Sequence, residues 1–278
     1  MHIYNKLDHT DLLPYLFHPA TTSRITSSLN YDDIDIPVNK DIVLGCRLFI
    51  KDKASPTILY FHGNGESVSD CEYIAPLYLE NGLNLLVLTY RGYGWSSGIP
   101  TVKDMMSDAK TSFIFCQKKL EEQGFTGPLF VMGRSIGSAA AIEVCCHHSE
   151  AIKGLLIESG FADTLPLLRN LGFDNSTLQL EEKDGFGNRE KIGTIKLPTL
   201  ILHGSLDTII PIPQAERLQA FSGARAKKFF IIPGADHNST ILLGGEHYFA
   251  TIMSFIHEIT GETSWRKRRK KYKDRAEK

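Results

Sequence analysis

The segment GRSIG at residues 133–137 restricts the fold of this chain more than any other feature of its sequence. An apolar run of strand length precedes it, and a helix-like stretch that begins with small residues follows it. The G-x-S-x-G spacing is typical of a nucleophile elbow, a strand-to-helix turn so tight that its serine takes strained backbone angles. An ordinary glycine-rich turn is the alternative, but strand, turn and helix occur here in the required order. We therefore expect Ser135 to project from the edge of a sheet, beside the free N–H groups of a helix.

Apolar runs of strand length alternate with amphipathic stretches of helix length, which predicts an α/β fold with a mostly parallel central sheet and helices on both faces. The first strand should form a hairpin with the second across Asn39-Lys40. Pro76 makes the centre of the first expected helix suspect. The expected strands are residues 34–38, 43–50, 57–61, 83–89, 129–132, 154–158, 199–203 and 228–232, and the expected helices are residues 69–81, 102–123, 135–148, 213–221 and 244–260.

A length of 278 residues suits one large α/β domain, to which we assign residues 1–264. The hydrophobic share of 42% allows a core of ordinary size. Residues 159–197 interrupt the rhythm, because they join two strands but exceed the length of a simple crossover. Their leucines and phenylalanines predict a helix plus a small cap.

The cysteines and the N-terminal sequence indicate the cellular compartment in which the protein is expected. Five cysteines are an odd number, and none has C-x-x-C spacing, which favours reduced thiols in the cytoplasm. The first residues have no basic start and no unbroken apolar core of signal-peptide length. No window approaches the length of a membrane-spanning helix. We expect a soluble, cytoplasmic protein.

The net charge of −1 conceals an asymmetry. Residues 265–278 hold nine Lys or Arg and two acidic residues, a net charge of +7, whereas the preceding 264 residues carry −8. A basic run of this kind is most often a solvated, disordered tail, and we favour that interpretation. The same charges would also suit weak contact with anionic lipid, or with RNA. We expect no specific nucleic-acid partner.

A serine nucleophile requires a base within hydrogen-bond reach, and the base is itself oriented by an acid. In a parallel sheet these groups should lie in loops at the carboxyl ends of strands. The loop after residues 199–203 carries Asp207, and the loop after the last strand carries His237. The resulting chain order of Ser135, Asp207 and His237 is the one known for α/β-hydrolases.

Other histidines compete with His237 for the role of base. His62 and His203 also follow strands, but both precede glycine in tight loops and have an architectural pattern. His247 falls inside the last expected helix. His237 is therefore the preferred base.

Other acids compete with Asp207. Glu158 ends the strand before the cap, a position from which a carboxylate can also reach the histidine. We prefer Asp207, because Glu158 can instead satisfy backbone N–H groups near the cap. Asp236, next to the base in sequence, is expected to be solvated.

Acyl transfer also requires donors for the oxygen that becomes negatively charged. One should be the N–H of Ile136, directly after the nucleophile. The other should come from the glycine-rich loop at residues 62–65, with Asn64 as the first choice and Gly65 as the second. These donors would form the oxyanion hole.

The motif order FHGNGE, TYRGYGWSSG, GRSIGS, HGSLD and GADH resembles α/β-hydrolases of the serine aminopeptidase-like, small-cap group. Within that group, residues 43–259 resemble the branch of the fission-yeast morphology hydrolase and the protein depalmitoylases. The resemblance implies Ser135 as nucleophile, His237 as base and Asp207 as acid. It implies Asn64 with Ile136 as the oxyanion hole.

These residues predict a serine hydrolase that cleaves carboxylic esters or thioesters of a small-molecule or acyl substrate, without cofactor or metal. The apolar cap residues suggest an acyl pocket, although they would equally form the core of the cap. Two other functions stay open. One is a peptidase that uses the same three side chains, and the other is a non-catalytic binding protein that keeps the fold.

Overall fold

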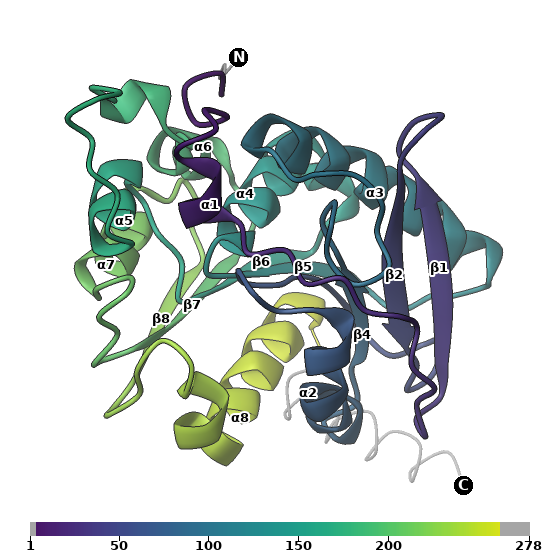
Figure 1. Cartoon of the computed structure of the whole chain (residues 1–278). Coiled ribbons are helices and arrows are strands. Elements are labelled where there is room, and N and C mark those ends of the chain that lie inside the picture. The colour runs from purple at the N-terminus through teal and green to yellow at the C-terminus, as the bar shows by residue number, and fades with distance from the viewer. Residues whose placement is uncertain (1–3, 262–278) are drawn as a thin grey trace, which may run out of the picture.

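The computed structural model describes residues 4–261, and a single eight-stranded sheet lies at its centre (Figure 1). The strand order is β1-β2-β4-β3-β5-β6-β7-β8. The first three strands in this order pair antiparallel and the rest pair parallel, so the predicted mostly parallel α/β architecture is confirmed. The strands are β1 (Tyr31–Pro37), β2 (Val43–Phe49), β3 (Thr57–Phe61), β4 (Asn84–Leu88), β5 (Leu129–Arg134), β6 (Gly154–Glu158), β7 (Thr199–Gly204) and β8 (Lys227–Ile232).

Helices cover both faces of the sheet (Figure 1). Helices α2 and α8 pack on one face, while α3, α4, α6 and α7 pack on the other. The helices are α1 (Leu13–Leu16), α2 (Val68–Glu80), α3 (Val102–Glu122), α4 (Gly137–His147), α5 (Thr164–Asn170), α6 (Asn188–Thr194), α7 (Pro213–Phe221) and α8 (Thr240–Thr260), with short 3-10 turns at Ser149–Ala151 and Glu182–Asp184. No helix within residues 4–261 has the length and apolar character needed to cross a membrane.

The central strands are buried on both sides, and this explains their continuous apolar sequence. In β3, Ile58 and Tyr60 contribute to the core under α2 and α8, whereas Leu59 and Phe61 contribute to the core on the opposite face. Successive side chains of a strand point to opposite faces, so one strand supplies both cores. The rigid centre of the sheet therefore fixes where the loops at its carboxyl edge begin.

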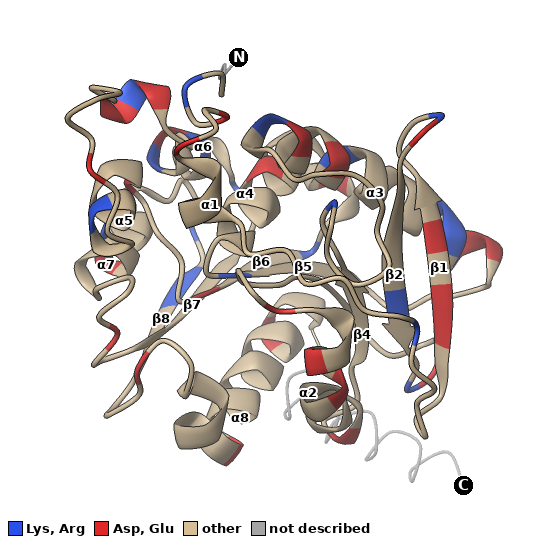
Figure 2. Ribbon diagram, in the orientation of Figure 1, with Lys and Arg blue, Asp and Glu red and all other residues tan. Residues whose placement is uncertain are grey.

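A buried arginine connects the two antiparallel strands at the edge of the sheet to helix α2. Arg47 on β2 is fully buried, and its guanidinium contacts Asp33 on β1 at 2.7 Å and Glu72 on α2 at 2.6 Å. It also donates to the carbonyl oxygen of Ile25 at 2.7 Å. Figure 2 shows the acidic stretch of β1 beside the basic residue of β2. This ion pair ties the predicted hairpin to helix α2.

Helices α2 and α8 bear on two expectations from the sequence. Helix α2 continues through Pro76, because burial of Cys71, Ala75 and Tyr78 holds both halves of the helix against the sheet. Helix α8 begins at residue 240 rather than 244, and Gly245 interrupts it with a φ of 47° and a ψ of −131°. Such a φ is open to glycine and costly for other residues, so the kink depends on this position.

The segment predicted as a helix plus cap, residues 159–197, contains α5, one 3-10 turn and α6. Helix α6 contacts α4 and α7, so this part of the segment packs against the body of the domain. The assignment of one domain with a cap stays a prediction. The predicted basic tail at residues 265–278 lies outside the described residues.

The N-terminal segment, residues 4–22, lies along the carboxyl edge of the sheet, which the sequence did not predict (Figure 1). Thr21 forms a parallel bridge with Gly94, and Tyr15 stacks edge-on against Phe173 with ring centroids 5.4 Å apart. Residues 4–22 therefore contact both the predicted cap, residues 159–197, and the loop after β4.

Gly137 offers a test of the close packing of α4 on the sheet. A Cβ at this residue would lie 2.2 Å from the carbonyl oxygen of Phe61, so Gly137→Ala should lower the free energy of unfolding by about 3 kcal/mol or more. The matched control is Gly193→Ala in α6, where the nearest atom would be at an ordinary 3.5 Å. That control should stay within about 1 kcal/mol of the wild type. Urea unfolding of both variants measures the difference, and equal stabilities would contradict the packing argument.

Candidate active site

A strained turn links β5 to α4 and carries Ser135 at its tip. Ser135 has a φ of +54°, which is uncommon for a residue with a side chain. A Cβ at Gly133 would lie 2.3 Å from the carbonyl oxygen of Gly137, so both glycines of the motif are required by close approach. Helix α4 therefore begins at Gly137, two residues later than the sequence predicts, because Ser135 cannot adopt helical angles there.

Three side chains from distant parts of the sequence meet beside this turn. His237 Nε2 lies 2.9 Å from Ser135 Oγ, and His237 Nδ1 lies 2.7 Å from Asp207 Oδ2. The three residues follow β5, β7 and β8, at the carboxyl edge of the sheet. A carboxylate only accepts hydrogen bonds, so Nδ1 carries the proton in neutral His237 and leaves Nε2 free to accept from the serine hydroxyl.

The carboxylate of Asp207 is fixed within its own loop. Its Oδ1 accepts the backbone N–H groups of Ile209 and Ile210 at 3.0 and 2.8 Å, and its side chain is fully buried. These bonds hold the second oxygen, Oδ2, toward His237. Asp207 is therefore positioned to orient the imidazole.

His203 lies near the same carboxylate but faces elsewhere. Its Nε2 is 2.7 Å from the carbonyl oxygen of Ile210 and 3.5 Å from Asp207 Oδ2. A carbonyl oxygen requires a donor, so Nε2 carries the proton. Burial lowers the pKa of His203, which keeps the ring neutral at pH 7. This histidine supports the loop and makes no hydrogen bond to Ser135.

The other competing histidines also lie apart from Ser135. His62 is fully buried, with its ring centroid 4.5 Å from that of Tyr90, and burial lowers its pKa. His247 lies within α8, as the sequence predicts. Neither makes a hydrogen bond to the serine among the described residues.

Glu158, the alternative acid, is fully buried but makes no hydrogen bond to His237 within residues 4–261. Its carboxylate accepts the hydroxyl of Tyr248 at 2.7 Å and the hydroxyl of Thr240. The expectation that Glu158 satisfies backbone N–H groups was wrong, because these two side-chain hydroxyls from α8 occupy it. Asp236 is exposed and accepts the N–H groups of Asn238 and Ser239 at 3.0 and 2.9 Å.

The loop after β3 carries Asn64, which the sequence predicts as the second N–H donor. Within residues 4–261, the N–H groups of Ile136 and Asn64 have no hydrogen-bond acceptor. The side-chain oxygen of Asn64 accepts the hydroxyl of Tyr93 and the N–H of His18, both at 2.7 Å. The choice between Asn64 and Gly65 as the donor from this loop stays a prediction.

Two features of the site were not predicted from the sequence. His18 comes from the N-terminal segment, and no motif in that segment predicts its contact with Asn64. Arg134 is a buried arginine in the turn itself, and its charge among small residues was a signal that could have been used. Tyr93 is fully buried, and its hydroxyl donates to the side-chain oxygen of Asn64.

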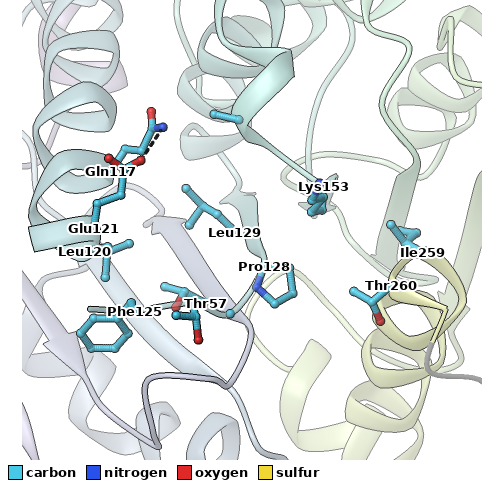
Figure 3. A pocket seen from close by; sticks show the side chains of 13 residues that line it. Thr57, Gln117, Leu120, Glu121, Phe125, Pro128, Leu129, Lys153, Ile259 and Thr260 are labelled. Atoms are coloured by element: carbon cyan, nitrogen blue, oxygen red, sulfur yellow. Dashed lines mark hydrogen bonds between the residues drawn. The ribbon is translucent and has the colours of Figure 1, made fainter. Parts of the chain in front are cut away.

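A pocket of about 560 Å³ opens at the opposite end of the strands (Figure 3). Thr57 and Leu129, the first residues of β3 and β5, line it, together with Pro128 and Phe125. The carboxyl edge with Ser135 is therefore remote from this pocket. Within residues 4–261, His, Cys and acidic side chains form no group of three or more that could hold a metal ion.

The sequence is similar to several known proteins. The family model described as "Serine aminopeptidase, S33" matches residues 52–168. The chain is 29% identical to protein bem46 of Schizosaccharomyces pombe, covering 83% of this chain and 78% of that protein. It is 27% identical to the α/β-hydrolase domain-containing protein WAV2 of Arabidopsis thaliana, covering 92% of this chain and 88% of that protein.

Solved structures share the fold at low sequence identity. The esterase Pf2001 of Pyrococcus furiosus is 18% identical with a TM-score of 0.69, covering 86% of this chain and 98% of that chain. A monoglyceride lipase of Saccharomyces cerevisiae is 16% identical with a TM-score of 0.63, covering 85% of this chain and 96% of that chain. Sequence and fold together support a hydrolase, and the chain is a member of the α/β-hydrolase superfamily.

Proposed function

We propose that this protein is a serine hydrolase that cleaves carboxylic ester or thioester bonds through an acyl-enzyme on Ser135. The observation that carries the proposal is a hydrogen-bonded row of three side chains, Ser135, His237 and Asp207. His237 Nε2 lies 2.9 Å from Ser135 Oγ, and His237 Nδ1 lies 2.7 Å from Asp207 Oδ2. A serine hydroxyl in such a row loses its proton to the histidine as it attacks a carbonyl carbon.

The reaction proceeds in two halves. In the first, Ser135 Oγ bonds to the carbonyl carbon, His237 takes the hydroxyl proton, and the N–H groups of Ile136 and Asn64 stabilise the oxyanion. The leaving alcohol or thiol departs with the proton from His237. In the second half, His237 takes a proton from water, the water oxygen attacks the acyl carbon, and Ser135 regains its proton as the acid is released.

The choice of an ester over a peptide substrate rests on the known proteins that this chain resembles. The neighbours named above as an esterase and a lipase favour an ester substrate. The family model named for a serine aminopeptidase keeps a peptidase as the second candidate. A non-catalytic binding protein is the third, and the intact hydrogen-bonded row argues against it.

A cytoplasmic location belongs to the same proposal. All five cysteines are free, and Cys46, Cys71, Cys116 and Cys145 are buried. Unpaired thiols in this number suit a reducing compartment.

Ser135→Ala should abolish labelling by a fluorophosphonate probe and lower ester hydrolysis by up to about 10⁶-fold, because the acyl-enzyme cannot form. Gel fluorescence and p-nitrophenyl ester hydrolysis measure the two effects, with the exposed Ser28→Ala as control. A panel of oxyesters, thioesters and aminoacyl anilides separates the candidates. Cleavage of anilides alone would favour the peptidase, and an unlabelled folded wild type would favour the binding protein.

Asp207→Asn should lower kcat by about 10⁴-fold, because an amide no longer fixes the tautomer of His237. Glu158→Gln should lower kcat less than about 10-fold, since Glu158 contacts hydroxyls and the Arg134 guanidinium rather than the histidine. Steady-state kinetics on one ester, with thermal unfolding as a folding check, compares the two. An inactive Glu158 variant beside an active Asp207 variant would reverse the assignment of the acid.

A further inference from the structure

Arg134, directly before Ser135, reaches the loop that carries His237. Its Nη2 donates to the carbonyl oxygen of His237 at 2.7 Å and to Asn238 Oδ1 at 2.9 Å. The side chain of Arg134 is only 10% exposed. Two bonds from one planar nitrogen thus hold the backbone and a neighbouring side chain of the loop after β8.

The same guanidinium also reaches the loop after β3. Its Nη1 donates to one oxygen of Glu66, and the other oxygen of Glu66 accepts the N–H of Gly63 at 2.8 Å. Gly63 immediately precedes Asn64, the donor assigned to the oxyanion hole. Arg134 Nε faces Glu158 at 3.6 Å, which leaves the cation between two carboxylates.

We propose that Arg134 is a positioning residue that fixes two loops relative to Ser135. These are the base loop, which follows β8 and carries His237, and the oxyanion loop, which follows β3 and carries Asn64. This inference rests on the proposed function, because it assigns a task within the same site. Arg134 touches no reacting atom and acts through the carbonyl of His237 and through Glu66. Its planar fork contacts both loops at once, which a lysine ammonium on a flexible stem cannot do with the same geometry.

The charge of Arg134 is maintained despite its burial. Burial lowers the pKa of the guanidinium, but the carboxylates of Glu66 and Glu158 outweigh this effect and raise the pKa above its ordinary value. A buried ion pair of this kind often adds little to net stability. The position that this ion pair imposes on the two loops matters more for the reaction rate than for stability. A displacement of about 1 Å in a catalytic group can lower the rate about 10²-fold.

The test uses Arg134→Lys in the full chain with a p-nitrophenyl ester. We expect kcat to fall about 10–100-fold and KM to change less than about 3-fold, because the displaced loops carry groups that act in the transition state. The rate constant for fluorophosphonate labelling should fall in parallel. Thermal unfolding shows whether the variant is folded.

The matched control is Arg47→Lys on β2. Arg47 is likewise buried, held by two carboxylates and a backbone carbonyl, but it lies at the antiparallel edge of the sheet. We expect a lower melting temperature and an unchanged kcat. An equal loss of kcat in both lysine variants would reduce Arg134 to a purely structural role and overturn the inference.

Asn238→Ala keeps the inference testable if Arg134→Lys fails to fold, because Asn238 is exposed. Loss of one hydrogen bond to the base loop should lower kcat about 3–10-fold with no change in melting temperature. An unchanged kcat in this variant would overturn the inference while a labelled, active wild type still supports the proposed function. A wild type that is neither labelled nor active would overturn both.

Discussion

The close contact between α4, β5 and β3 is the constraint on which the site depends. Gly137 lies so near the carbonyl of Phe61 that a single methyl group would collide with it, and Gly133 has the same relation to Gly137. This contact draws the chain into a turn in which Ser135 takes a φ of +54°. The strain is sustained because the strands on either side are buried on both faces and cannot relax.

Parallel pairing then determines which residues can join Ser135. Strands β5, β7 and β8 end at one edge of the sheet, so the loops that follow them converge there. Asp207 and His237 come from two of these loops and form the row with the serine. The loop after β3 ends at the same edge, which accounts for the position of Asn64. Sheet topology thus brings together residues that are up to 173 positions apart.

The charged side chains at the site connect loops to one another, whereas the apolar core holds the helices on the sheet. Glu158, Glu66 and Arg134 lie at the turn, and each has at least one partner on another element. The N-terminal segment adds His18, which engages Asn64 from a part of the chain far from every motif. These contacts link the loops of the site to one another, and burial makes them costly to break one partner at a time.

The sequence by itself determined the alternation of strands and helices, the tight turn at Ser135 and the candidate residues Asp207 and His237, because these depend on local periodicity, glycine placement and chain order. It did not determine the intact helix across Pro76, the early start of α8 or the partners of Glu158, since packing and burial decide those. The path of residues 4–22 and the reach of Arg134 to two loops also needed the tertiary structure. Local patterns specify which backbone shapes a segment can adopt, whereas contacts between distant segments exist only after the sheet has brought their ends together.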